Sequence, residues 1–256
     1  MVLPDNWFIL AAGGLSSGLL AGLLGIGGGV VLVPILVTLG YAPVQSVATS
    51  SLAIVMTSLS GSWQNWRMGY LDFKRIIMLG FPSLLTAQLG AKLSNQMPSY
   101  LLLASFGCLL IANIFLVMLR KHLISQNKSE SPKISPLISS LGTGSAAGLL
   151  AGLFGVGGGV ILVPLQMLLL REKIKVAIQT SLGVIVITSI SACVGHGLRG
   201  NLLIYEGIIL GIGGLIGAQL STRYLPKLPD KVVEFGFRTL LAILAIYFFW
   251  RAGNSY

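Results

Sequence analysis

Residues 18–36 read GLLAGLLGIGGGVVLVPIL, and residues 148–166 read GLLAGLFGVGGGVILVPLQ. The two stretches are identical at 14 of 19 positions and lie 130 residues apart. In each stretch, glycines interrupt a long apolar run, and each glycine weakens a helix by about 1 kcal/mol relative to alanine. The duplicated stretch therefore predicts two copies of one unit, each built around a broken helix.

The similarity between the two halves extends beyond this stretch. Residues 50–52 align with residues 180–182 at the same offset. After a shift of one residue, residues 87–89 align with residues 218–220. The predicted organisation is a first repeat at 1–125, a polar linker at 126–134 and a second repeat at 135–256.

The composition of the 256-residue chain excludes a soluble or a disordered protein. Hydrophobic residues make up 54% of it, charged residues only 9%, and the mean hydropathy is +0.88, whereas a soluble domain carries about 25% charged residues. The 17 Lys and Arg outnumber the 7 Asp and Glu, which gives a pI near 9.9. Because the basic residues lie in short gaps between apolar runs, this charge indicates a positive-inside membrane protein and no nucleic-acid partner.

Eight apolar runs follow one another with short connections. A helix that spans a bilayer needs about 20 apolar residues, and the first and fifth runs exceed this length and contain the glycines. The runs occupy residues 7–39, 44–63, 75–92, 99–119, 135–170, 176–195, 202–222 and 232–250. The predicted fold class is an all-α integral membrane protein with two repeats, each beginning with a glycine-broken helix or helical hairpin.

The distribution of Lys and Arg predicts that the two repeats are inverted. If each broken run crossed the membrane once, the basic residues would divide almost equally between the two sides. If each run folds back at its glycines, 14 lie on one side, and only Lys92, Arg199 and Arg251 lie on the other. Since the cytoplasmic side carries the excess of Lys and Arg, we expect hairpins, a cytoplasmic linker and both termini outside. The count of Lys and Arg does not distinguish a shallow re-entrant hairpin from two full crossings, because both leave the ends of the run on the same side.

The glycine triplets at 27–29 and 157–159 are candidates for a substrate site. A break in a membrane helix leaves N–H groups unpaired, and the positive end of the following half-helix favours an anion. Neither triplet belongs to a Walker A loop or a G-x-G-x-x-G motif, so a nucleotide site is not expected. The outer glycines, at 14, 18 and 22 and at 144, 148 and 152, have the small-residue spacing that brings membrane helices together.

Hydroxyl side chains follow each break. Residues 49–51 are Thr-Ser-Ser, and residues 179–181 are Gln-Thr-Ser. Such hydroxyls often bond carbonyls of their own helix, but their repetition favours a cluster of neutral donors that faces the breaks. No Asp or Glu lies in the middle of any run, whereas a cation transporter normally needs an intramembrane carboxylate. These features favour an anion as the substrate.

His196 ends its apolar run, directly before Gly197-Leu198-Arg199. One interpretation is an interfacial histidine with a structural hydrogen bond, and the other is a gating or proton-coupling residue. At an offset of 130, the first half carries Trp66 at this position. Any role for His196 would therefore apply to one half only.

The doubled glycine stretch resembles the signature of the sulfite exporter TauE/SafE family. Residues 46–51 (SVATSS) and 217–220 (GAQL) are also similar to that family, and the resemblance covers nearly the whole chain. It implies a multi-pass permease of the inner (plasma) membrane for small anions, especially sulfite, organosulfonates and related sulfur compounds.

We therefore predict a secondary transporter that exports a small sulfur-containing anion. A passive anion channel and a permease for another small organic anion remain alternatives. We expect no enzyme activity, no cofactor and no metal site, because the chain lacks a buried Asp pair, an H-E-x-x-H motif and a Ser–His pair in register; the expected partners are the anionic substrate and the lipid bilayer. The predicted substrate-binding residues are Gly27, Gly28, Gly29, Thr49, Ser50, Ser51, Gly157, Gly158, Gly159, Gln179, Thr180 and Ser181, and His196 is the predicted gating or proton-coupling residue.

Overall fold

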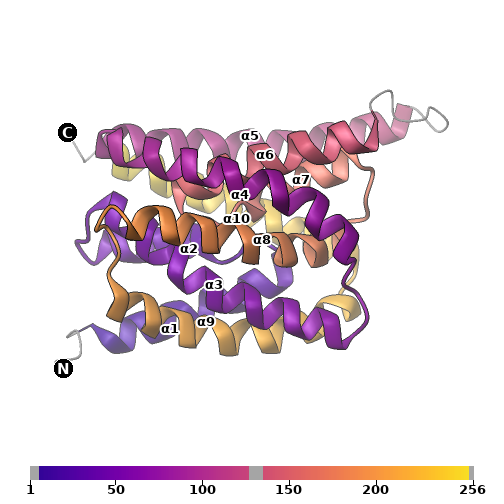
Figure 1. The fold of residues 1–256 in the computed structure, drawn as a ribbon. Coiled ribbons are helices and arrows are strands. Elements are labelled where there is room, and N and C mark those ends of the chain that lie inside the picture. Colours follow the sequence, from indigo (N-terminus) through magenta and orange to yellow (C-terminus); the bar gives the residue numbers. More distant parts are fainter. Residues whose placement is uncertain (1–5, 127–134, 254–256) are drawn as a thin grey trace.

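The computed structural model describes residues 6–126 and 135–253, and these residues form only helices and their connections. Apart from residue 126, the predicted linker lies outside the described residues. The helices are α1 (Trp7–Leu24), α2 (Gly29–Thr38), α3 (Pro43–Arg67), α4 (Phe73–Gln96), α5 (Ser99–Gln126), α6 (Pro136–Phe154), α7 (Gly159–Leu169), α8 (Ile174–Gly197), α9 (Ile204–Tyr224), the short 3-10 helix η1 (Leu225–Lys227) and α10 (Asp230–Gly253). The all-helical fold class is confirmed (Figure 1).

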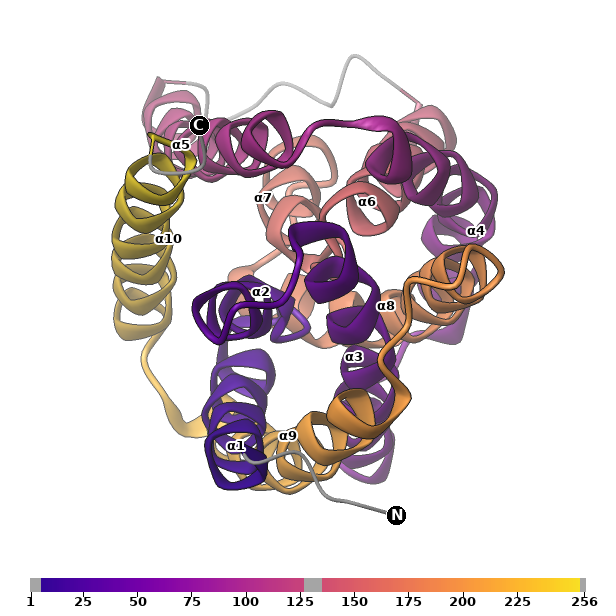
Figure 2. The same ribbon diagram turned by 90° about the vertical axis from the view of Figure 1, so that its left-hand side faces the viewer.

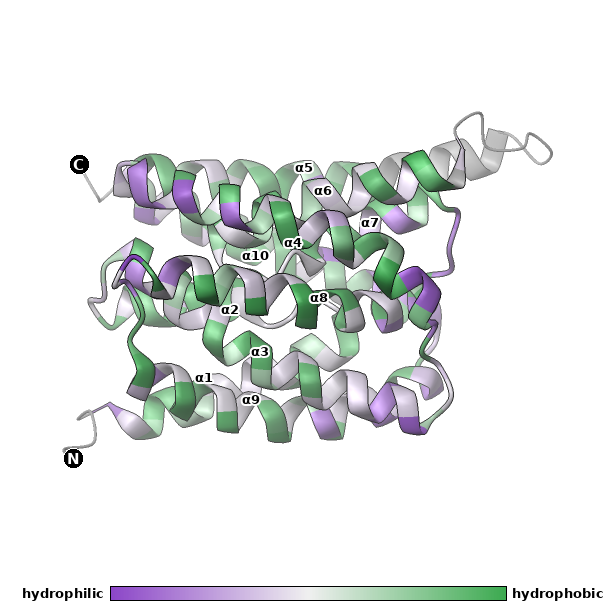
Figure 3. Cartoon of the chain, viewed as in Figure 1, coloured by the Kyte–Doolittle hydropathy of each residue, from purple (hydrophilic) through white to green (hydrophobic). Residues whose placement is uncertain are grey.

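Seven of the described helices, α1, α4, α5, α6, α8, α9 and α10, are long and apolar enough to cross a membrane. Figure 3 shows their largely apolar midsections between two more polar ends. Helices α2 and α7 have only 10 and 11 residues, which corresponds to about half the thickness of a bilayer core. The overlong first and fifth runs are thus each divided into one long helix and one short one.

Helix α3 has 25 residues but is less apolar than the seven, because it carries many Ser, Thr and amide side chains. Most of these polar side chains are buried. The helix packs against α8 and α9, so its polar groups contact protein instead of lipid. Helix α8 is its counterpart in the second half and packs in the same way against α3 and α4.

Helices from the two halves are interleaved. Helix α1 packs along α9, and α6 packs along α4. Glycines form both seams: Gly14 and Gly18 lie directly against the backbone carbonyls of Leu210 and Gly214, so α1 and α9 run parallel. Gly144, Gly148 and Gly152 contact α4 in the same manner at Leu79, Ser83 and Ala87. The prediction that the outer glycines serve helix packing is confirmed.

Two ends of the bundle can be distinguished by their contacts. At one, here called the basic end, Arg75 pairs with Glu172, and Lys175 pairs with Asp230. The connections α3–α4, α7–α8 and α9–α10 therefore lie together at this end. At the opposite end, the side chain of Asn201 donates to that of Asn95. The connections α4–α5 and α8–α9 therefore meet there.

Each glycine-broken run folds back on itself. Helix α1 starts at the opposite end beside the start of α9, because Gly14 contacts Leu210. The residues after α2 return to the same place, since the Tyr41 hydroxyl lies 3.4 Å from a carboxylate oxygen of Glu206 near the start of α9. Viewed along the helices, α2 and α7 lie in the middle of the bundle (Figure 2). Helices α5 and α10 flank them on one side, and α3 and α8 flank them on the other.

Candidate functional site

The two breaks have nearly the same backbone geometry. Helix α2 begins after Gly28 at φ 87°, and helix α7 begins after Gly158 at φ 80°. These values lie in the left-handed region, which is accessible to glycine at little cost but strained for residues with a Cβ. Neither glycine can supply a side-chain cap to the helix that it precedes, so the first N–H groups of each half-helix need partners from elsewhere.

The breaks lie side by side in the centre of the protein. Gly29 lies against the carbonyl of Gly155, and Gly159 lies against the carbonyl of Gly25. A Cβ at either position would overlap with the backbone of the other break. The two segments therefore cross closely, and the positive ends of the α2 and α7 half-helices meet in the same region.

Backbone carbonyls at the breaks have hydroxyl partners. Ser17 Oγ donates to the Gly28 carbonyl at 3.0 Å, and Thr188 Oγ1 donates to the Gly157 carbonyl at 2.8 Å. Ser50 Oγ reaches across from α3 and lies 2.7 Å from the Gly155 carbonyl. These three carbonyls are therefore occupied by fixed donors, whereas the carbonyls of residues 25–27 and of residue 156 have no hydrogen-bond partner among the described residues.

The N–H groups of residues 26–30 and of residues 156–160 have no hydrogen-bond partner within the described part of the chain. All of these residues are buried. More than 90% of buried backbone N–H groups in proteins are paired, so two adjacent sets of unpaired donors are unusual. They supply positive electrostatic potential in a region where no charged side chain is found among the described residues that contact the breaks.

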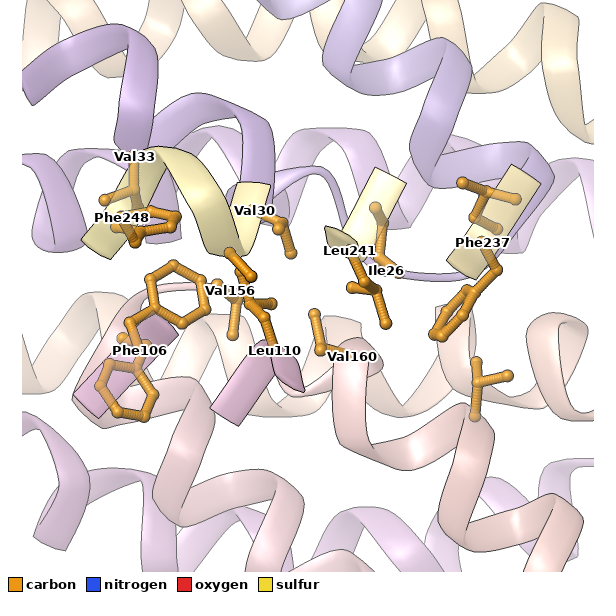
Figure 4. Packing of buried hydrophobic residues seen from close by; sticks show 14 of the residues in the cluster. Ile26, Val30, Val33, Phe106, Leu110, Val156, Val160, Phe237, Leu241 and Phe248 are labelled. Carbon is orange, nitrogen blue, oxygen red and sulfur yellow. The ribbon is translucent and has the colours of Figure 1, made fainter. Parts of the chain in front are cut away.

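Apolar side chains enclose the breaks. Ile54 of α3 and Ile185 of α8 each lie against both Gly27 and Gly157. On the other side, Val30 and Val156 pack with Leu110 of α5 in one hydrophobic cluster (Figure 4). In this conformation the donors are therefore surrounded by apolar groups, and an anion can reach them only after these side chains move.

The predicted hydroxyls have different surroundings. Ser50 lies at a break, whereas Ser51 donates to Val47 of its own helix, and Thr49 accepts from the N–H of Leu203 near the opposite end. In the second half, Ser181 accepts from the side chain of Gln166. Gln179 and Thr180 are buried and make no hydrogen bond to any described side chain.

Three contacts at the breaks were absent from the predicted set. Ser17 lies eleven residues before its acceptor, and no sequence pattern connects the two. Thr188 could have been found, because Thr57-Ser58 and Thr188-Ser189 align at an offset of 131. The paired Ile54 and Ile185 follow the same offset, but isoleucine in an apolar run carries no signal of a site.

His196 is fully buried, and its Nε2 lies 2.8 Å from the carbonyl of Gly152, one turn before the second break. The prediction that Trp66 is its counterpart in the first half is wrong. Ser60 donates to the Leu215 carbonyl just as Ser191 donates to the Leu84 carbonyl, so the offset at this depth is 131. The counterpart of His196 is therefore Asn65, which is also fully buried and whose amide atoms have no partner in the described residues.

Membrane-length helices that surround two half-helices with adjoining positive ends form the architecture of a membrane transporter. Comparison with known proteins supports the same class of protein. The chain belongs to the sulfite exporter TauE/SafE family, which matches residues 10–248. It is 28% identical to the "Probable membrane transporter protein YunE" of Bacillus subtilis, over 93% of this chain and 96% of the relative. It is 31% identical to a "Probable membrane transporter protein" of Methanocaldococcus jannaschii, over 90% of each chain.

Proposed function

We propose that this membrane transporter is a secondary transporter of the cell membrane that exports a small anion containing sulfur, such as sulfite or an organosulfonate. The observation that carries this proposal is the pair of unpaired N–H sets at residues 26–30 and 156–160. Backbone N–H groups at the start of a helix bind anions without a charged side chain. Membership in the sulfite exporter family supports sulfur oxyanions as the class of substrate.

The amount of positive charge at the breaks favours a singly charged substrate. Each half-helix end is equivalent to roughly half an elementary charge, so α2 and α7 together offset about one negative charge. Burying a second, uncompensated charge is very costly. We therefore expect hydrogensulfite or a monosulfonate to be carried in preference to sulfite dianion or sulfate.

The proposed transport cycle uses two inverted repeats. Helix α4 starts at the basic end, whereas its counterpart α9 starts at the opposite end, and this arrangement supports opposite directions for the two halves. Rocking of one half against the other would expose the breaks first to one side and then to the other. The concentration of Lys and Arg supports a cytoplasmic location of the basic end, with both termini outside.

In this cycle, His196 is the proposed gating or proton-coupling residue. Its bond to the Gly152 carbonyl links the end of α8 to the last turns of α6, directly before the second break. Movement of α6 would change this contact. Since histidine changes its charge near neutral pH, its protonation can be coupled to that movement.

Counterflow in proteoliposomes tests the function. Purified protein is supplied with sulfite, thiosulfate, sulfoacetate, methanesulfonate, sulfate or acetate at acid and at alkaline pH. We expect saturable counterflow of sulfite and of monosulfonates, and faster sulfite counterflow at acid pH, where hydrogensulfite predominates. Flux without counterflow would instead identify a passive channel. Equal transport of sulfate would contradict the preference for a monoanion, and transport of acetate alone would contradict a sulfur-containing substrate.

A further inference from the structure

A polar hollow of about 370 Å³ opens at the basic end between α4, α6 and α7. Two other hollows of the described surface, one between α1 and α9 and one between α5 and α10, are lined almost entirely by apolar side chains, and a third, also between α5 and α10, includes Arg238 and Thr239 but no acidic or amide side chain. The polar and charged residues of the hollow at the basic end are Asp72, Lys74, Arg75, Ser140, Gln166 and Glu172. Its chemistry therefore differs from that of a lipid-facing groove.

Arg75 is held between two carboxylates at the mouth of this hollow. Its Nη1 lies 2.5 Å from Glu172 Oε1, and its Nε lies 3.0 Å from Asp72 Oδ2. The side chain of Arg75 is 44% exposed, and that of Glu172 is 20% exposed. A partly exposed ion pair of this kind contributes little net stability, so another oxyanion can replace Glu172 at the guanidinium.

The inner wall of the hollow connects it to α8. Gln166 is 1% exposed, and its Nε2 lies 3.1 Å from Ser181 Oγ. Ser140, on the neighbouring wall, is 6% exposed. A ligand at Arg75 would thus lie near buried polar groups that lead to Ser181, which belongs to the predicted substrate-binding set.

We propose that this hollow is a capture subsite for a small oxyanion on its way to the glycine breaks. The oxyanion takes the place of the Glu172 carboxylate and forms paired hydrogen bonds with the Arg75 guanidinium, a geometry that suits sulfonate and sulfite oxygens. Lys74 adds positive potential at the mouth. Release of Glu172 also removes an ion pair between the α7–α8 connection and α4, so capture loosens a contact at the basic end. This subsite rests on the proposed function.

The related contact at the opposite end has different chemistry. Applying the repeat offset of 131 places Glu206 at the position of Arg75 and Tyr41 at the position of Glu172. There the Tyr41 hydroxyl donates to the carboxylate of Glu206. Burial, and secondly the negative charge of Glu206, raises the pKa of Tyr41, so the phenol stays protonated. An anion that arrives at this contact meets a carboxylate at the position where the basic end has a guanidinium, which favours the basic end as the side of capture.

Isothermal titration calorimetry of the purified protein in detergent tests the subsite, with methanesulfonate, sulfoacetate, sulfite and acetate as probes at low salt. We expect Arg75→Gln to weaken binding of the preferred anion by roughly 10-fold, because paired charged hydrogen bonds are lost. Glu172→Gln should tighten binding by about threefold, because the competing carboxylate is neutralised. Lys231→Gln is the matched control, since Lys231 is an exposed basic residue at the same end but outside the hollow.

Two results would overturn the capture subsite. One is that no probe binds the wild-type protein, and the other is that Arg75→Gln and Glu172→Gln both bind like Lys231→Gln. Because Arg75→Gln could destabilise the fold, its unfolding temperature is measured alongside, and Glu172→Gln provides the independent variant. The proposed function fails separately: binding without counterflow in proteoliposomes contradicts transport, whereas counterflow with unchanged binding in both variants contradicts only the subsite.

Discussion

At the centre of the protein, the backbones of the two halves are nearly interchangeable. Gly28 and Gly158 precede their half-helices at φ 87° and φ 80°. Gly29 approaches the second break just as Gly159 approaches the first. The N–H groups of residues 26–30 and of residues 156–160 both lack hydrogen-bond partners among the described residues. A substrate at the centre would therefore meet the same backbone groups from either side, although the side chains differ, because Ser17 lies at Gly28 and Ala147 lies at Gly158.

At the ends of the bundle, by contrast, the two halves differ. An Arg–Glu ion pair lies at the basic end, and a Tyr–Glu hydrogen bond occupies the related position at the opposite end. In the last turns of α8 and α3, His196 corresponds to Asn65. In the proposed transport cycle, the symmetric backbone at the centre lets one site serve both sides, and the unequal ends give transport a direction. Four experiments test this contrast between centre and ends.

The largest expected difference is in labelling of the two ends. In a background without Cys108 and Cys193, Lys173→Cys lies at the basic end and Leu198→Cys lies at the opposite end, and both positions are exposed. An impermeant thiol reagent added to intact cells should label residue 198 and leave residue 173 unlabelled until the membrane is opened. Labelling of residue 173 alone would place the basic end outside and would reverse the proposed orientation.

Valine at the breaks should abolish transport. In Gly28→Val and in Gly158→Val, a β-branched residue is forced to a positive φ, at a cost of about 1–3 kcal/mol, and the new side chain meets Ser17 or Ala147. We expect counterflow to fall by at least about 100-fold in both, because a barrier increase of about 3 kcal/mol has this effect.

Gly142→Ala is the control for these variants, because a Cβ at Gly142 of α6 meets no neighbouring atom. It should transport like the wild type. Membrane yield and unfolding temperature show whether the valine variants still fold. If one valine variant is inactive and the other is fully active, the two breaks are not equivalent, and the symmetry of the centre is lost.

Removal of a hydroxyl that bonds a carbonyl at the breaks should reduce stability and counterflow moderately. Ser50→Ala leaves the Gly155 carbonyl without its donor, and Thr188→Val does the same at Gly157. We expect each variant to be less stable by about 1 kcal/mol and its counterflow to fall about 5-fold, since that free energy corresponds to such a factor. Ser58→Ala, whose hydroxyl bonds only carbonyls of its own helix, should remain close to wild type. Equal losses in all three variants would indicate a general effect of buried hydroxyls.

The smallest expected effect concerns pH. Methanesulfonate is a suitable probe because its charge does not change between acid and alkaline conditions. The ratio of its counterflow at acid and at alkaline pH should differ from one in the wild type by roughly threefold, owing to His196, and should approach one in His196→Asn. Asn65→His should restore a pH dependence in that background if the two positions are equivalent. An unchanged ratio in His196→Asn would exclude proton coupling through this residue.

Most of the fold could be predicted from the sequence. The apolar runs correspond to the helices, because a chain of this hydropathy can satisfy its backbone in lipid only through helices of sufficient length. The predicted breaks at 27–29 and 157–159 follow the ends of α1 and α6 and reach the first residues of α2 and α7. Glycine clusters are reliable in this respect, since their effect on a helix is local.

The surroundings of the predicted site were harder to derive. Thr49, Ser50 and Ser51 are consecutive, yet only Ser50 reaches a break, because successive residues on a helix point about 100° apart. The second half contains one extra residue relative to the first, which changes the offset between equivalent residues from 130 to 131. The counterpart of His196 is therefore Asn65 and not the predicted Trp66. Sequence alignment of two short repeats does not locate such a shift, whereas paired contacts do.

The sequence by itself determined that this protein is a duplicated, helical membrane protein with two glycine-broken runs, because hydropathy, charge and glycine content act locally along the chain. Only the tertiary structure decided that the breaks cross each other, that Ser17 and Thr188 occupy their carbonyls, and that Arg75 faces Glu172 across a hollow. These contacts join residues distant in sequence. They depend on the depth and rotation at which whole helices pack, and such packing is set by the sum of many small side-chain contacts.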